Sequence, residues 1–97
     1  MFIKNGIAYA ENREPILTAV AVRPLENYNL WVKFSDGAIK QVDLKPFLNE
    51  PVFKSLKTNS VFNKVYVDYG CVVWNDGEID IAPETLYHNG VAVSATA

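Results

Sequence analysis

Two runs of β-forming residues, 71–74 and 78–81, flank the sequence Asn75-Asp76-Gly77 and predict a hairpin. We take the loop as three residues, with Gly77 in the left-handed conformation that glycine adopts without a steric penalty. A two-residue loop would place Trp74 beside Ile79, because a shift of one residue moves every side chain to the other face. The three-residue register instead predicts an apolar face of Cys71, Val73, Ile79 and Ile81, and a mixed face of Val72, Trp74, Glu78 and Asp80.

The length and composition of the chain indicate one small globular domain. The chain has 97 residues, 49% of them apolar, and a formal net charge of −2. One compact core is the expectation for this size. The negative charge argues against nucleic acid as a partner of this chain alone, since phosphate backbones attract basic proteins. The first residues hold no long apolar stretch, which argues against a signal peptide or a membrane partner.

Cys71 is the single cysteine, so the chain can form no internal disulfide. A lone thiol in a β-rich chain fits a reducing compartment, and we expect a cytoplasmic protein. The predicted register buries Cys71, where a thiol behaves as a small hydrophobic side chain and does not react.

The chain divides into three parts. We expect residues 1–15 to form an N-terminal β-hairpin around Asn5-Gly6, followed by a polar connector. Residues 16–90 form a single α+β domain, and residues 91–97 are small, weakly patterned side chains that predict a frayed tail.

Within the domain, strands over 16–23, 28–34 and 38–44 predict an antiparallel meander. The loop between the second and third strands is Ser35-Asp36-Gly37, a three-residue turn with Gly37 at the left-handed position. This register turns one set of side chains inward: Leu30, Val32, Phe34, Val42 and Leu44. The other face carries Trp31, Lys33, Ile39, Gln41 and Asp43.

Short helical segments follow the meander. Residues 45–48, 51–56 and 59–62 carry apolar side chains on one side and predict turns of helix that cover the sheet. A strand over 64–69, the 71–81 hairpin and a helix over 83–88 complete the domain. The predicted fold class is therefore α+β, an antiparallel meander with short helices packed on one face.

The sequence holds no recognisable catalytic set, and we expect neither an enzyme nor a cofactor. His88 is the single histidine, and the carboxylates Asp76, Glu78, Asp80 and Glu84 lack the spacing of a calcium loop, so we expect no metal. A Cys71–His88 dyad is disfavoured because the register buries Cys71. Two alternatives remain open for Trp74: it is either part of a recognition surface beside acidic residues or packed under the C-terminal helix.

Landmarks between about Ile16 and Tyr87 resemble a bacterial family known as domain of unknown function 2442. They are Leu30-x-Val32-x-Phe34-Ser35-Asp36-Gly37, Val42-Asp43-Leu44 with Phe47-Leu48, Phe53-x-x-Leu56, Phe62-x-x-Val65-x-Val67-Asp68, and Trp74 followed by Asp80-Ile81-x-Pro83-x-x-Leu86-Tyr87. The resemblance implies an α+β domain with an antiparallel sheet. It also implies an antitoxin of a toxin–antitoxin pair, because genes of the family often lie beside a gene for a small toxin. Some relatives carry a helix-turn-helix, for which this sequence has no matching segment.

We therefore expect a non-catalytic interaction protein, an antitoxin that binds and neutralises a co-encoded small toxin. The alternative is a small-molecule-binding or regulatory domain without its DNA-binding module. If both hairpins join one sheet, its helix-free face is too apolar to stay bare. We expect this face to bind the toxin or, as a homo-oligomer, a second copy of the chain, through Trp31, Ile39, Val72 and Trp74. The alternative is that the predicted N-terminal hairpin, with Phe2, Ile7 and Tyr9, covers this face within one chain.

Overall fold

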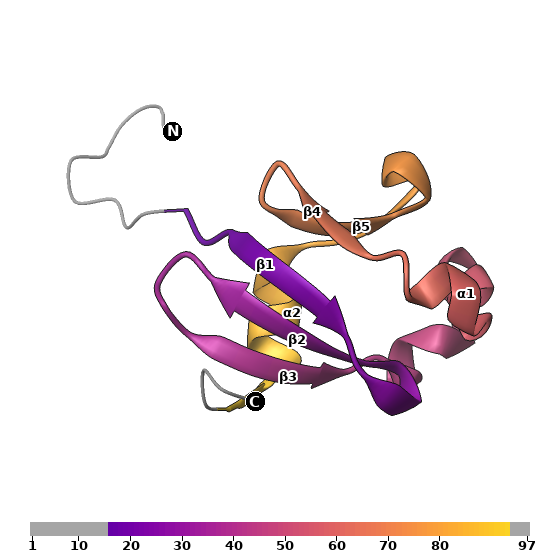
Figure 1. Cartoon of the computed structure of the whole chain (residues 1–97), viewed down its shortest axis with the longest axis horizontal. Helices are drawn as coiled ribbons and strands as arrows, with labels where there is room; N and C mark the ends of the chain where they lie inside the picture. The colour runs from indigo at the N-terminus through magenta and orange to yellow at the C-terminus, as the bar shows by residue number, and fades with distance from the viewer. Residues whose placement is uncertain (1–15, 94–97) are drawn as a thin grey trace.

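The computed structural model describes residues 16–93 and has two antiparallel sheets with short helices, which confirms the α+β class (Figure 1). The N-terminal hairpin predicted within residues 1–15 lies outside the described residues. The strands of the first sheet, in the order in which they pair, are β1 (Ala19–Pro24), β2 (Asn29–Phe34), β3 (Ile39–Asp43) and β7 (Val91–Ala92).

The predicted register of the β2–β3 hairpin is confirmed. Leu30 pairs with Val42 and Val32 pairs with Lys40. Gly37 has a φ of +91° and its N–H donates to the Phe34 carbonyl over 2.9 Å. The Asp36 carboxylate accepts from the Ala38 N–H over 2.9 Å. The three-residue loop therefore forms as the glycine and the polar side chain require.

The C-terminal segment differs from the prediction of a frayed tail. Val91–Ala92 forms β7, which pairs with Gln41 and Lys40 of β3, and the Val93 N–H donates to the Ile39 carbonyl over 3.0 Å. Without β7, the outer edge of β3 would present unpaired backbone groups. The Val-Ala-Val sequence is short, but it can form the strand that pairs with the outer edge of β3.

The second hairpin builds a separate sheet and does not extend the first one. Its strands, in pairing order, are β4 (Tyr66–Asp68), β5 (Cys71–Trp74) and β6 (Ile79–Ile81). It lies beside β1 (Figure 1), where the Ala19 N–H donates to the Gly70 carbonyl over 2.8 Å. The condition under which Val72 and Trp74 would share a face with Trp31 and Ile39, one sheet that contains both hairpins, is therefore not met.

The predicted three-residue register of the β5–β6 hairpin is also wrong. Trp74 pairs with Ile79 and Val72 pairs with Ile81. Asp76 and Gly77 have φ values of +57° and +89°, and the Glu78 N–H donates to the Asn75 carbonyl over 3.1 Å. Asp76 and Gly77 are thus the central residues of a type I′ turn, and since Asn75 (φ +53°) and Glu78 (φ −64°) are not extended either, the loop between the paired Trp74 and Ile79 spans four residues. The positive φ of Gly77 is as predicted, but Asp76 shares the left-handed conformation, which aspartate tolerates better than most residues.

This one-residue slip exchanges the two faces of the hairpin. Val72, Trp74, Ile79 and Ile81 face the core, and Trp74 is fully buried with its Nε1–H donating to the Phe62 carbonyl over 2.9 Å. Cys71 lies on the opposite face and is half-buried, so the prediction of a fully buried thiol is wrong. The hydrogen bond to Phe62 lets the indole sit in the core without an unpaired donor.

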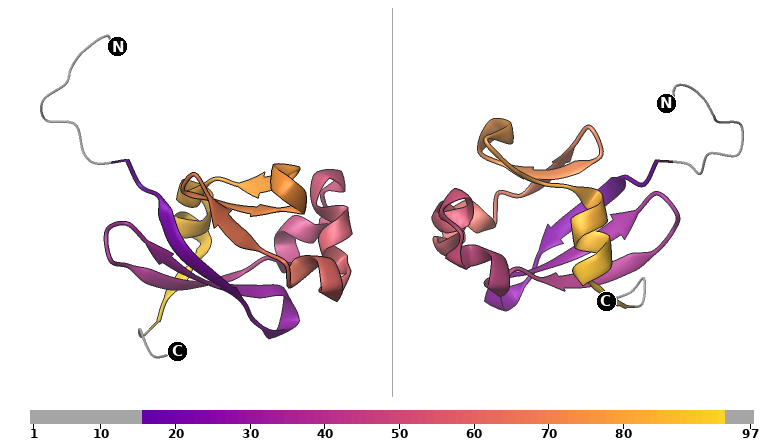
Figure 2. Two further views of the ribbon diagram at one scale, coloured as in Figure 1. Left: turned by 45° about the horizontal axis from the view of Figure 1, so that its top comes forward. Right: turned by 180° about the vertical axis from the view of Figure 1, so that it is seen from behind.

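Short helices complete the core. Those that bury side chains are η2 (Lys45–Asn49), η3 (Pro51–Lys57), α1 (Asn59–Phe62) and α2 (Pro83–Asn89). Two further turns, η1 (Glu26–Tyr28) and η4 (Asn75–Gly77), contain left-handed residues and bury no side chain. Helix α2 lies across one face of the first sheet, as Figure 2 shows from behind. Between this face, α2, the helical turns and the second sheet lies one cluster of buried side chains that includes Leu30, Phe34, Leu56, Phe62, Trp74 and Leu86.

Candidate interaction surface

The four residues predicted to form one binding face do not lie together. Trp31 and Ile39 lie on the face of the first sheet away from α2, because Lys40, on the alternate face of β3, donates to the Tyr87 carbonyl of α2. Val72 and Trp74 are fully buried in the core. The prediction that Val72 and Trp74 are available to a partner is therefore wrong, because the register of the second hairpin turns both side chains inward.

The outer face of the first sheet is partly closed by its own side chains. Arg23, Trp31 and Gln41 form a row across three strands, and the Arg23 guanidinium lies 4.8 Å from the centre of the Trp31 ring. Trp31 is only 7% exposed, and its Nε1–H has no acceptor among residues 16–93. A shallow groove of about 280 Å³ lies beside it, lined by Asn29, Gln41, Val91 and Val93.

A second surface, which sequence reasoning missed, lies on the outer face of the second sheet. Tyr66, Val73 and Asp80 form a row across β4, β5 and β6, and Asp68 lies two residues after Tyr66 on the same face. We define the hairpin surface as Tyr66, Asp68 and Asp80 together with Tyr69 at the tip of the β4–β5 turn; Val73 lies between Tyr66 and Asp80 but is only 4% exposed. Tyr66 is 39% exposed, and both aspartates are exposed.

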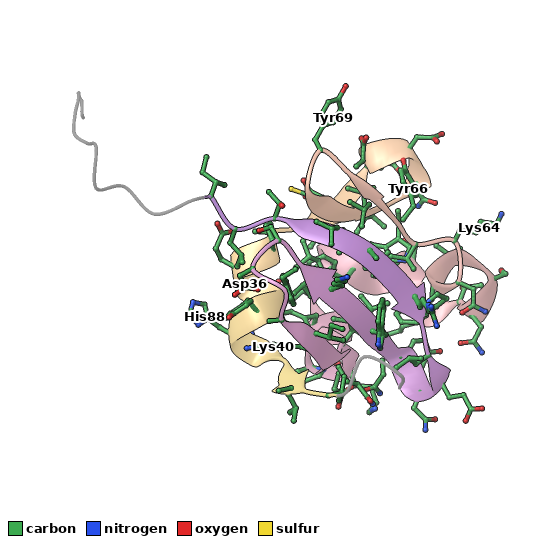
Figure 3. The ribbon with its side chains drawn as sticks, turned by 60° about the vertical axis from the view of Figure 1, so that its left-hand side comes forward. Asp36, Lys40, Lys64, Tyr66, Tyr69 and His88 are labelled. Atoms are coloured by element: carbon green, nitrogen blue, oxygen red, sulfur yellow. The ribbon has the colours of Figure 1, made fainter. Side chains whose placement is uncertain are left out.

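Tyr69 and Gly70 form the β4–β5 turn between the paired residues Asp68 and Cys71. Both turn residues have positive φ, +51° for Tyr69 and +79° for Gly70. Gly70 is held against β1, since an added Cβ would lie 2.8 Å from Thr18 Cγ2. Tyr69 instead points away from the body of the molecule and is 97% exposed (Figure 3).

The conformation of Tyr69 is costly for its residue type. The first position of a two-residue type I′ turn favours asparagine, aspartate or glycine, and another residue there costs on the order of 1 kcal/mol. An exposed aromatic ring buries little apolar area and therefore contributes little to the stability of the fold. A tyrosine in place of asparagine before the turn glycine is the sequence signal that marks this position.

Asp36 and Tyr87 connect the β2–β3 loop to α2. The Tyr87 hydroxyl donates to Asp36 Oδ2 over 2.7 Å, and Lys40 Nζ lies 3.7 Å from the centre of the Tyr87 ring. The hydrogen bond from the Ala38 N–H, followed by the one from Tyr87, lowers the pKa of Asp36. The same contact raises the pKa of Tyr87. These groups hold one another at the surface, and Figure 3 shows Asp36 and Lys40 close to α2.

A polar hollow of about 630 Å³ opens between η1 and α1. Glu26, Asn27, Asn59 and Asn63 line it, together with Pro24 and Leu25. Over residues 16–93, no group of three or more histidine, cysteine or carboxylate side chains is placed to hold a metal ion. None of the helices in this part of the chain has the length and apolar character that a membrane crossing requires.

Comparison with known families identifies residues 19–92 with the family described as Protein of unknown function (DUF2442). The chain belongs to this family. The match covers both sheets and α2, and with them the segments that carry the hairpin surface in this chain. No curated protein and no solved structure matches the chain.

Proposed function

We propose that this DUF2442 protein is a non-catalytic, cytoplasmic interaction protein, an antitoxin that binds and neutralises a small toxin encoded beside it. The likeness of the chain to its family motivates the toxin as the partner. The observation that carries partner binding is Tyr69, a fully exposed aromatic side chain held in a left-handed turn. Strained residues that the fold does not need are concentrated at functional sites.

Tyrosine has the properties of an interface anchor. Its ring buries a large apolar area when a partner covers it, and its hydroxyl can pair at the rim of the contact. Few rotatable bonds are fixed on binding, so little conformational entropy is lost. A turn anchored by Gly70 on Thr18 presents this ring on a fixed support.

Co-expression tests the proposed function. The proposal requires a small reading frame next to this gene, whose product is expressed alone and then with the natural chain. We expect growth arrest in the first case and recovery in the second, together with co-purification of the two proteins. If the two purified proteins do not bind each other, the proposed function is wrong.

The polar hollow between η1 and α1 favours the alternative function, a small-molecule-binding domain. Three asparagine amides and one carboxylate there could orient a small polar ligand. If such a ligand bound there, Asn59→Ala would weaken binding while leaving toxin binding unchanged.

A further inference from the structure

We infer that the hairpin surface is the docking site and that its partner is a basic protein, with lysine or arginine side chains around an apolar pocket that accepts Tyr69. This inference rests on the proposed function, because it names the surface and the chemistry of the partner. There are two alternative occupants, a nucleic acid and a second copy of the chain. The negative charge of the surface argues against a nucleic acid, and the experiment below tests for a second copy.

The distribution of charge in the sequence supports a basic partner. Residues 65–82 contain Asp68, Asp76, Glu78 and Asp80 and no lysine or arginine, a formal charge of −4. The whole chain has nine basic and eleven acidic residues, so the remainder has nine basic against seven acidic residues, or +2. The net negative charge of the protein therefore comes entirely from the second sheet and its loops.

The four carboxylates are available to a partner. All four residues are exposed. The ion pair among residues 16–93 joins Lys45 Nζ to Asp43 Oδ1 over 3.0 Å, so none of the four is neutralised within this part of the chain. A field of one sign speeds the approach of an oppositely charged partner and repels a nucleic acid.

The tyrosines lie beside two of these carboxylates. Tyr66 and Asp80 flank the buried Val73 across the sheet, and Asp68 directly precedes Tyr69, whereas Asp76 and Glu78 lie in the loop at the other end of the hairpin. Aromatic anchors with polar residues at their rim are the usual arrangement of a protein interface. The hairpin surface thus presents two exposed tyrosines next to two exposed carboxylates on one sheet.

Charge-matched variants test the inference. Asp68→Asn with Asp80→Asn removes two charges from the hairpin surface, and Glu50→Gln with Glu84→Gln removes two exposed charges from other elements. Affinity for the adjacent gene product is measured by titration calorimetry at low and at high ionic strength, and thermal unfolding verifies that each variant is folded. We expect the first pair to weaken binding by about tenfold and to reduce its salt dependence, and the control pair to change affinity less than about twofold.

Other results would overturn the inference. An equal loss of affinity in the two double variants would mean that only the net charge of the protein matters. Unchanged affinity of Asp68→Asn with Asp80→Asn would place the interface elsewhere. Either result would leave the proposed function intact, whereas failure of the natural chain to bind would overturn both. Sedimentation that shows a dimer of the natural chain, dissolved by Asp68→Asn with Asp80→Asn, would assign the surface to a second copy instead.

Discussion

At the scale of single residues, left-handed backbone occurs at positions where the fold requires it and also at Tyr69, where the fold does not. Asp76 and Gly77 have positive φ and reverse the chain between β5 and β6 with residue types that accept this conformation. Gly70 has positive φ and no Cβ, and both properties are needed where the turn touches Thr18. Tyr69 has neither the preferred residue type nor a packing partner, which is why we assign it to binding.

A pH-dependent contribution to stability belongs to the contact between Asp36 and Tyr87. The pKa of Asp36 lies below its ordinary value of 3.8, so the contact favours the ionised carboxylate of the folded state. This stabilisation is present above pH 3.8 and is lost as the pH falls below that value through the folded pKa. The pKa of Tyr87 lies above 10.0, so its contribution is present below pH 10.0 and is lost at higher pH.

Thermal unfolding of Asp36→Asn against the natural chain measures this effect. The variant resembles the protonated carboxyl group, so we expect its melting temperature to be lower at neutral pH. The difference should shrink as the pH falls below 3.8. A difference that stays constant across this range would show that the charge of Asp36 does not stabilise the fold.

At the scale of secondary structure elements, alternation of side chains explains which register could be predicted. In β2 and β3, apolar and polar residues alternate, and only one register pairs Leu30 with Val42 on the inner face. In β5, Cys71-Val72-Val73-Trp74 is apolar on both faces, so the sequence pattern does not say which face is buried. The geometry of the turn decides which face is buried, and Asn75-Asp76-Gly77 contains residues that are compatible with either of the loop lengths considered.

Replacing each of the two tryptophans by phenylalanine tests the register of the β5–β6 hairpin. Trp74→Phe removes the donor to the Phe62 carbonyl and leaves a smaller ring in a fully buried site. We expect the free energy of unfolding to fall by about 1–3 kcal/mol, measured by urea denaturation. Trp31→Phe should lower it less, because Trp31 Nε1–H has no acceptor within residues 16–93. Equal losses, or a larger loss for Trp31→Phe, would contradict the assignment of Trp74 to the core.

At the scale of the whole molecule, the second sheet takes the covering role that the sequence assigned to helices alone. Its inner face supplies Val72, Trp74, Ile79 and Ile81 to the core, and its outer face becomes a surface. The α+β class followed from short strands mixed with short helical segments. The separation into two sheets did not, because it depends on long-range contacts between β1 and the β4–β5 turn.

The candidate site could be predicted only in part. Trp31 and Ile39 lie on the outer face of the first sheet, as alternation along β2 and β3 indicates. The exposure of Tyr69 depends on which neighbours reach the turn, and local sequence carries little information about that. The acidic character of residues 65–82 was present in the sequence, but its place on one sheet required the fold.

The measurement that tests partner binding through the hairpin surface most directly is a calorimetric titration of Tyr69→Asn with the adjacent gene product. Asparagine tolerates the left-handed conformation, so the free energy of unfolding should stay equal or rise by up to about 1 kcal/mol. Loss of a tyrosine anchor should weaken binding by more than about tenfold. Val52→Asn serves as the control, since it replaces an exposed apolar side chain on η3. Unchanged affinity for Tyr69→Asn, or an equal loss for Val52→Asn, would contradict the account.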